Sequence, residues 1–288
     1  MEWVDTVLQG VLLGGLYALF ATGLSLIFGV MRLVNIAHGD LIVLAAFVAL
    51  VVTQGLGLPP LLSLLVVVPV MAAVGYGLQR GLLNRTLGGD ILPPLLVTFG
   101  LSIVIQNALL ELFTADSRKL QVGPLETASL QLGGGLAIGW LPLIVFAAAV
   151  LVIGALQLLF YCTALGRAFR ATSDDPETVR LMGIDNHHLF GLAMAIALAV
   201  VAVAGVFLAI RTNFDPTIGP GRLIYAFEAV IIGGLGSLWG TLAGGVLLGV
   251  AQSIGAKIDP GWQILAGHLA FLAVLVLRPR GLFPRAVD

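Results

Sequence analysis

Long apolar runs separated by short polar stretches follow one another along the whole chain. A helix crosses the hydrocarbon core of a membrane with about 20 consecutive apolar residues. The runs lack the alternation at every second residue that barrel strands show. We therefore predict an all-α integral membrane protein, a polytopic helical bundle of about eight or nine spans. The predicted spans cover residues 7–30, 41–53, 61–83, 92–113, 140–161, 189–210, 223–233, 238–256 and 262–277.

The composition supports this class. Of the 288 residues 59% are hydrophobic and 10% are charged, whereas soluble domains average roughly 25% charged residues. A soluble protein of this size could not bury so much apolar surface. We expect one transmembrane domain over residues 1–288, and the net charge of −1 gives no indication of a nucleic-acid partner.

Two polar or glycine-rich interruptions occupy similar places in the two halves of the chain, at Met31–Asp40 and Gly233–Gly245. Paired breaks of this kind indicate discontinuous helices around a translocation site and two related halves. Ordinary interfacial turns are the alternative; it stays open for the first break, whereas the many glycines favour the translocation site for the second. The candidate path residues in the breaks are Asn35, His38, Asp40, Gly233, Gly234 and Gly236.

Polar side chains also lie inside predicted spans. Thr98, Ser102 and Gln106 are four residues apart and share one helical face. Hydrogen bonding between helices explains each of them singly, but as a stripe they favour a path for a polar solute. Glu228 either faces the cavity or, as we expect, pairs with Arg222 of the preceding loop.

The longest polar stretch runs from Gly166 to Asp185. Any residue of Ser173–Asp175 can cap a short helix, Pro176 suits its first position, and Gly183 can end it in the left-handed conformation. A plain chain reversal needs only a few residues, so we interpret the loop 166–188 as a docking element, with a solvated loop as the alternative. The candidate docking residues are Asp175, Pro176, Glu177, Arg180, Leu181, Met182 and Gly183.

Three segments together carry a family resemblance. The stretch 166–185, NIAHGD at Asn35–Asp40 and GGLGSLWGTLAGG at Gly233–Gly245 resemble the permease subunits of branched-chain amino acid ABC importers. In that family the corresponding cytoplasmic loop seats on the ATPase subunit and is called the coupling helix. His38 lies in what looks like the family's A-H-G motif, and whether it and Asp40 contact substrate or shape a gate is open.

The resemblance also implies partners. It implies a second permease subunit, identical or different, two cytoplasmic ATPase subunits, and an external solute-binding protein. The chain has no G-x-x-x-x-G-K-[ST] pattern, and its only lysines are Lys119 and Lys257. We therefore expect no cofactor in this chain, with ATP and Mg²⁺ on the partner ATPases.

Charge distribution predicts the orientation in the membrane. With segment 166–188 in the cytoplasm, nine of the 14 basic residues fall inside, as the positive-inside rule favours. The N-terminus is then outside and the C-terminus inside a bacterial or archaeal plasma (inner) membrane. The nine residues are Arg32, Arg80, Arg85, Arg167, Arg170, Arg180, Arg278, Arg280 and Arg285.

A second function class stays open. A self-contained channel or secondary transporter, for example for urea or a small amide, needs no docking helix and usually carries protonatable residues deep in its bundle. Few such residues occur here. The four histidines and the single cysteine show no metal-ligand grouping, so we expect no metal site, and no catalytic constellation suggests an enzyme.

Overall fold

The structure, a computed structural model of the chain, describes residues 2–87, 92–133 and 136–283. Among these residues, eight helices are long and apolar enough to cross a membrane, which confirms the polytopic all-α class. The helices are α1 Glu2–Met31, α2 His38–Leu56, α3 Leu64–Gly81, α4 Leu92–Phe113, α5 Trp140–Cys162, α6 Ala164–Asp174, α7 Pro176–Leu181, α8 Asn186–Arg211, α9 Gly219–Gly233, α10 Leu238–Ile258 and α11 Gln263–Leu277.

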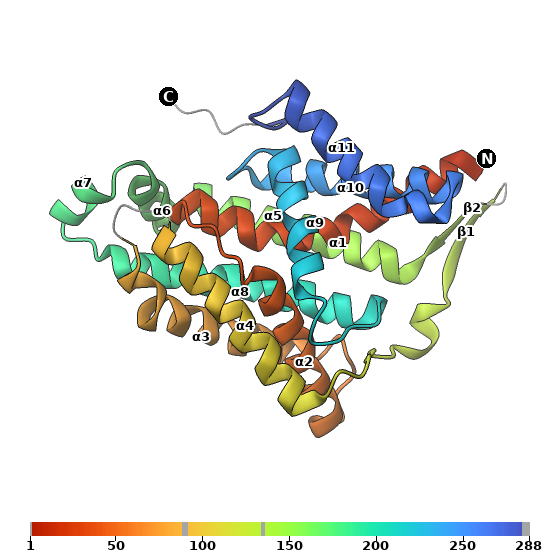
Figure 1. Cartoon of the computed structure of the whole chain (residues 1–288), viewed down its shortest axis with the longest axis horizontal. Coiled ribbons are helices and arrows are strands. Elements are labelled where there is room, and N and C mark those ends of the chain that lie inside the picture. Colours follow the sequence, from red (N-terminus) through yellow and green to blue (C-terminus); the bar gives the residue numbers. More distant parts are fainter. Residues whose placement is uncertain (1, 88–91, 134–135, 284–288) are drawn as a thin grey trace.

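Long helices lie side by side and define two ends of the bundle (Figure 1). The helices α6 and α7 form one end. A hairpin of β1 (Ser129–Gly133) and β2 (Leu136–Gly139) lies at the other end, where Gln9 donates to the Ala137 carbonyl at 3.1 Å. The hairpin lies between the predicted spans 92–113 and 140–161. Arg285 lies outside the described residues.

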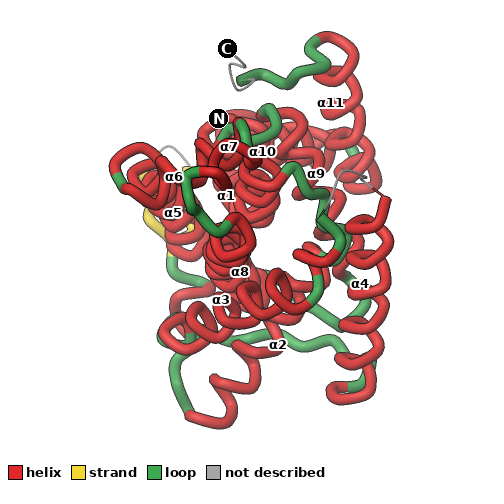
Figure 2. The backbone as a smooth tube through the Cα atoms, turned by 90° about the vertical axis from the view of Figure 1, so that its left-hand side faces the viewer, coloured by secondary structure: helices red, strands yellow, loops and turns green. Residues whose placement is uncertain are grey.

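Two helices form the centre of the bundle. α1 and α8 are buried along most of their length, and α10 packs along α1 as α3 packs along α8. α5 and α6 lie on the side of the bundle opposite α4 and α11 (Figure 2). The small residues of α1 allow its neighbours to pack this closely. A Cβ on Gly14 would lie 2.4 Å from Val246 Cα of α10. Close helix approach through glycine is a common packing mode in membranes.

The first four and last four helices repeat one arrangement in opposite directions. In each set a long helix is followed by a break and a shorter helix, and α4 contacts α2 as α11 contacts α9. α1 ends beside α6, where Ser173 donates to the Gly29 carbonyl at 2.8 Å, whereas α8 begins at that end directly after α7. The predicted related halves are thus α1–α4 and α8–α11, with the same order of helices but opposite orientation.

The first break re-enters the bundle. His38, the first residue of α2, lies with Nε2 2.7 Å from the Phe20 carbonyl oxygen. Phe20 lies about 16 Å before the end of α1, at 1.5 Å per helical residue. The chain after Met31 therefore turns back along α1, and α2 begins near the middle of the bundle.

The second break lies elsewhere than predicted. The counterpart of the first break is the segment 212–218 after α8, and α9 begins at Gly219, four residues before the predicted span. Pro220 in the first turn of α9 was the overlooked start signal. The stretch Gly233–Gly245 is mostly helical, because only residues 234–237 form a turn and α10 resumes at Leu238.

Candidate functional site

Polar contacts fix the backbone of the first break at membrane depth. The Asn35 side-chain oxygen accepts from the Ala37 amide at 3.0 Å, and the Ile36 amide donates to Thr98 Oγ1 of α4 at 3.2 Å. Unpaired backbone groups are costly away from water. Asn35 and Thr98 therefore explain how the chain can leave and re-enter helical structure here. Neither Asn35 nor Asp40 caps α2, since the cap position is Ala37.

The carboxylate of Asp40 joins α2 to α4. Ser102 Oγ donates to Asp40 Oδ2 at 2.5 Å, and Gln106 Nε2 donates to Asp40 Oδ1 at 2.9 Å. Asp40 occupies the first turn of α2, where the helix dipole favours a negative charge. The stripe Thr98–Ser102–Gln106 thus faces one partner segment, as its spacing predicted. Its contacts in this structure are hydrogen bonds between helices; its role in a path stays a prediction.

The starts of α2 and α9 meet at two glycines. A Cβ on Gly39 would lie 2.0 Å from the Gly219 carbonyl oxygen, and a Cβ on Gly219 would lie equally close to Asp40 Oδ1. No larger residue fits between the two helix starts. We call residues 35–40 together with Gly219 the α2–α9 junction. Its members from the first break, Asn35, His38 and Asp40, are almost completely buried.

The partner of Glu228 differs from the predicted one, Arg222. The Glu228 carboxylate contacts Nδ1 of His268 on α11, and no hydrogen bond or ion pair joins it to Arg222 among the described residues. Glu228 is buried in α9, so the contact ties α9 to α11 as Asp40 ties α2 to α4. The sequence analysis missed His268, because nothing in a single apolar span indicates which helix lies beside it.

The glycines of the α9–α10 turn lie away from the junction. Gly234 and Gly236 have φ values of 103° and 79°, which residues with a Cβ rarely adopt. A Cβ on Gly29, near the end of α1, would lie 3.3 Å from Gly236, so the turn belongs to the α6–α7 end. The amide of Phe283 donates to the Gly233 carbonyl at 3.0 Å. The structure therefore does not bring Gly233, Gly234 and Gly236 together with Asp40.

The short helix predicted within the loop 166–188 is present as α7. The Asp175 carboxylate accepts from the backbone amides of Glu177 and Thr178, each at 3.1 Å, and from the Thr178 hydroxyl. These hydrogen bonds, that of the hydroxyl first, lower the pKa of Asp175 below its ordinary value. Pro176 is the first helical residue, and Gly183 follows the helix with a φ of 83°.

The side chains of α7 face two environments. Val179 is buried, whereas Leu181 is 88% exposed and Met182, just after the helix, is 76% exposed. Arg180 and Glu177 are also exposed. A short helix at the tip of the molecule thus presents two apolar side chains to its surroundings, which is typical of a contact surface for another protein.

A preceding helix, which the sequence analysis did not assign, supports α7. Thr163 caps α6 by accepting from the Gly166 amide at 3.0 Å, and Phe169 is buried beneath it. On the other side, Asn186 at the start of α8 donates to the Pro176 carbonyl at 2.6 Å. The strong 3.6-residue periodicity of residues 164–174 was the available signal. Among the described residues no three His, Cys, Asp or Glu side chains group as metal ligands.

Comparison with known proteins identifies relatives along the full length. The chain is 32% identical to the high-affinity branched-chain amino acid transport system permease protein BraD of Pseudomonas aeruginosa, over 99% of this chain and 96% of the relative. It is 27% identical to the corresponding LivH protein of Salmonella typhimurium over the same shares. The probable LivH protein of Methanocaldococcus jannaschii is 28% identical, over 96% and 91% of the two chains.

The fold also has a solved relative. A chain of PsaBC from Streptococcus pneumoniae, determined in complex with Fab, superposes with a TM-score of 0.51 at 13% identity, over 97% of this chain and 96% of that one. This likeness concerns the fold alone.

The family described as the permease component of branched-chain amino acid transport systems matches residues 6–276. The chain therefore belongs to this family of ABC-importer permease subunits and is a transport subunit, not an enzyme.

Proposed function

We propose that the chain, paired with a second permease subunit, forms the membrane path for branched-chain or other hydrophobic amino acids and is driven by ATPase subunits that bind α7. The relatives BraD and LivH are named for branched-chain amino acid transport. The single observation that carries the coupling role is the exposure of Leu181 and Met182 on a capped helix at the tip of the bundle.

The α2–α9 junction is proposed as the mid-membrane barrier of the path. Two helix starts meet there at Gly39 and Gly219, and the Asp40 carboxylate lies between α2 and α4. Half-helix starts of inverted repeats surround substrate sites in many transporters. Because Asp40 and the Ile36 amide bond to side chains of α4, the junction supports a closed state that opens when α2 and α9 separate. Thr98, Ser102, Gln106 and Glu228 would then line the opened path.

The remaining partners follow from the same proposal. ATP and Mg²⁺ would act on two ATPases at the α6–α7 end, and an external solute-binding protein would dock at the hairpin end. The N-terminal end of α1 lies by the hairpin, where Lys257 bonds Glu2 at 2.8 Å. Residue Phe283, by contrast, lies by the turn at the α6–α7 end. This relative placement supports an outer N-terminus and an inner C-terminus.

Substitution of the exposed apolar pair tests the coupling. Burial of a Leu or Met side chain contributes roughly 1.5–3 kcal/mol, whereas an ion pair at the rim contributes about 0–1 kcal/mol. We expect Leu181→Asp or Met182→Asp to release the ATPase, and Arg180→Ala on the same helix to have a milder effect. The measurement is copurification of the ATPase with each tagged permease, together with ATP hydrolysis stimulated by solute and binding protein in liposomes.

A folding control separates lost docking from lost structure. Both side chains are exposed, so the aspartate variants should unfold at the same temperature as the parent chain. If both variants keep full ATPase binding and full stimulation, α7 is only a connecting segment and the coupling proposal fails.

A further inference from the structure

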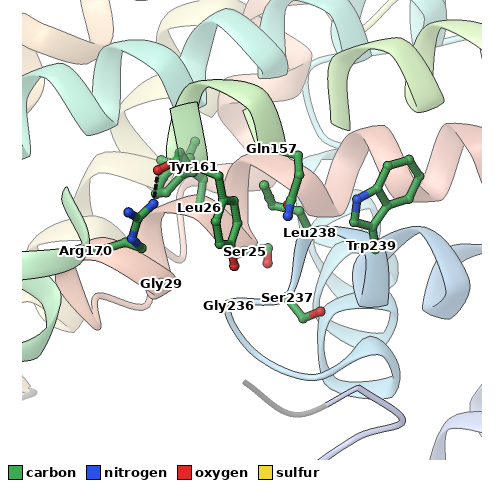
Figure 3. A pocket seen from close by; sticks show the side chains of 11 residues that line it. Ser25, Leu26, Gly29, Gln157, Tyr161, Arg170, Gly236, Ser237, Leu238 and Trp239 are labelled. Carbon is green, nitrogen blue, oxygen red and sulfur yellow. Dashed lines mark hydrogen bonds between the residues drawn. The ribbon is translucent and has the colours of Figure 1, made fainter. Parts of the chain in front are cut away.

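A cavity of about 240 Å³ lies at the α6–α7 end of the bundle (Figure 3). Its walls come from α1, α5, α6 and the turn between α9 and α10. The polar or aromatic side chains that line it belong to Ser25, Gln157, Phe160, Tyr161, Arg170, Ser237 and Trp239. None of the described lining residues is acidic. The cavity is separate from the α2–α9 junction and from the exposed face of α7.

Positive charge is concentrated in this cavity. The Arg170 guanidinium donates one N–H group to the Phe160 carbonyl and lies 5.0 Å from the centre of the Tyr161 ring. Arginine has five N–H donors in a fixed fork, so this contact leaves others to face the cavity. The start of α10 adds the positive end of its helix dipole. Ser237 caps this helix by accepting a hydrogen bond from the Gly240 amide at 3.1 Å. The first N–H groups of any helix lack partners within the helix and can bind an anion.

An unpartnered hydroxyl gives independent support for a ligand. Ser25 of α1 is 1% exposed and lines the cavity, and its Oγ has no hydrogen-bond partner among the residues that the structure describes. A buried hydroxyl without a partner is uncommon in folded proteins. Figure 3 shows the Ser25 hydroxyl between the Arg170 guanidinium on one side of the cavity and the Ser237 hydroxyl on the other. Each of these groups can donate hydrogen bonds to an anion in the cavity.

The position of the cavity indicates where that anion comes from. Ser25 and Gly29 lie in the last two turns of α1, so the cavity is near the membrane surface on the α6–α7 side. Tyr161 and Trp239 at its rim are exposed, as aromatic residues at headgroup level are. Leu158, one turn deeper on α5, is also exposed and offers an apolar surface to an acyl chain.

We propose that this cavity binds the phosphate group of a phospholipid from the leaflet on the α6–α7 side. Arg170 provides the charge, Ser25 and the start of α10 provide hydrogen bonds, and the acyl chains lie along α5 outside the cavity. Basic pockets between membrane helices on this side of a bundle suit such headgroups. A lipid held there joins α6, which carries α7, to the α9–α10 turn.

Lipid binding to the full-length chain tests the proposal. The chain is purified in detergent, stripped of lipid and titrated with phosphatidylglycerol, and binding is followed by native mass spectrometry and by the unfolding temperature. We expect Arg170→Gln to weaken binding about five- to tenfold. Arg167→Gln is the matched control, because Arg167 is exposed on α6 outside the cavity and should leave binding unchanged.

Further variants and ligands separate the alternatives. Arg170→Lys should restore much of the binding, and Ser25→Ala, which removes only the hydroxyl, should weaken it even if Arg170→Gln fails to fold. Diacylglycerol, which lacks the phosphate, should bind far more weakly. Equal binding of diacylglycerol, or equal losses in Arg170→Gln and Arg167→Gln, would overturn the proposal. Stabilisation by millimolar inorganic phosphate equal to that by lipid would overturn it in favour of a soluble anion.

Discussion

The α2–α9 junction and the α7 helix place polar and apolar residues in opposite environments. At the junction, the carboxylate of Asp40 is buried in the middle of an apolar bundle and bonded to Ser102 and Gln106. On α7, the apolar side chains of Leu181 and Met182 are exposed at the tip of the molecule. Each region contains the residue type that its surroundings disfavour.

A buried polar group and an exposed apolar group both cost free energy, but the two regions offset this cost in different ways. A buried polar group is costly unless it is hydrogen-bonded, and at the junction two donors of this chain satisfy the Asp40 carboxylate. For the exposed apolar side chains of α7, a favourable free energy comes only from burial against another molecule, which removes their surface from water. The junction therefore depends on packing inside this chain, whereas α7 depends on a partner in the function proposed above, and variants in the two regions should fail in different ways.

The largest effect is expected for Gly39→Ala. The added Cβ would lie 2.0 Å from the Gly219 carbonyl oxygen, so the starts of α2 and α9 must separate, and overpacking typically costs about 1–3 kcal/mol. Gly77→Ala is the matched control, because a Cβ there has no atom within 4 Å and alanine is preferred in helices by about 0.5–1 kcal/mol. The two unfolding temperatures should move in opposite directions.

A smaller effect is expected for Ser102→Ala. Asp40 then loses a donor in a buried site, which costs about 1–3 kcal/mol. Asn107→Ala on the same helix is the control, since Asn107 is exposed and its side chain donates to the Ile103 carbonyl of its own helix. We expect Ser102→Ala to lower the unfolding temperature and Asn107→Ala to leave it unchanged. Reduced uptake in Ser102→Ala at an unaltered unfolding temperature would instead place Ser102 in the path.

The smallest effect concerns acidification of α7. The folded-state pKa of Asp175 is depressed, so its contribution to helix stability is complete above the unfolded pKa of ~3.9 and is lost as the pH falls through the folded pKa. Amide hydrogen exchange of residues 177–182, corrected for intrinsic rates, should be constant above about pH 5 and accelerate below about pH 4. Asp175→Asn should remove this dependence; an unchanged acid response in that variant would exclude Asp175 as its source.

Local signals predicted α7 better than the junction. Asp175, Pro176 and Gly183 are capping, starting and stopping residues whose effects extend over one turn, and each has the predicted role. The junction combines segments about 180 residues apart in the chain, and no local signal specified that Gly39 meets Gly219. The same limit explains the wrong partner of Glu228, since Arg222 is near in sequence but His268 is near in space.

By itself, the sequence determined the membrane class, the approximate spans, the polar face of α4 and the short capped helix α7. These depend on the length of apolar runs and on contacts within one or two turns, which neighbouring residues specify. The tertiary structure decided which break is paired with the first, which polar groups bond one another, and that Arg170, Ser25 and the start of α10 line one cavity. These depend on how helices distant in the chain pack together, because similar apolar surfaces leave many arrangements open until close glycine contacts and buried hydrogen bonds select one.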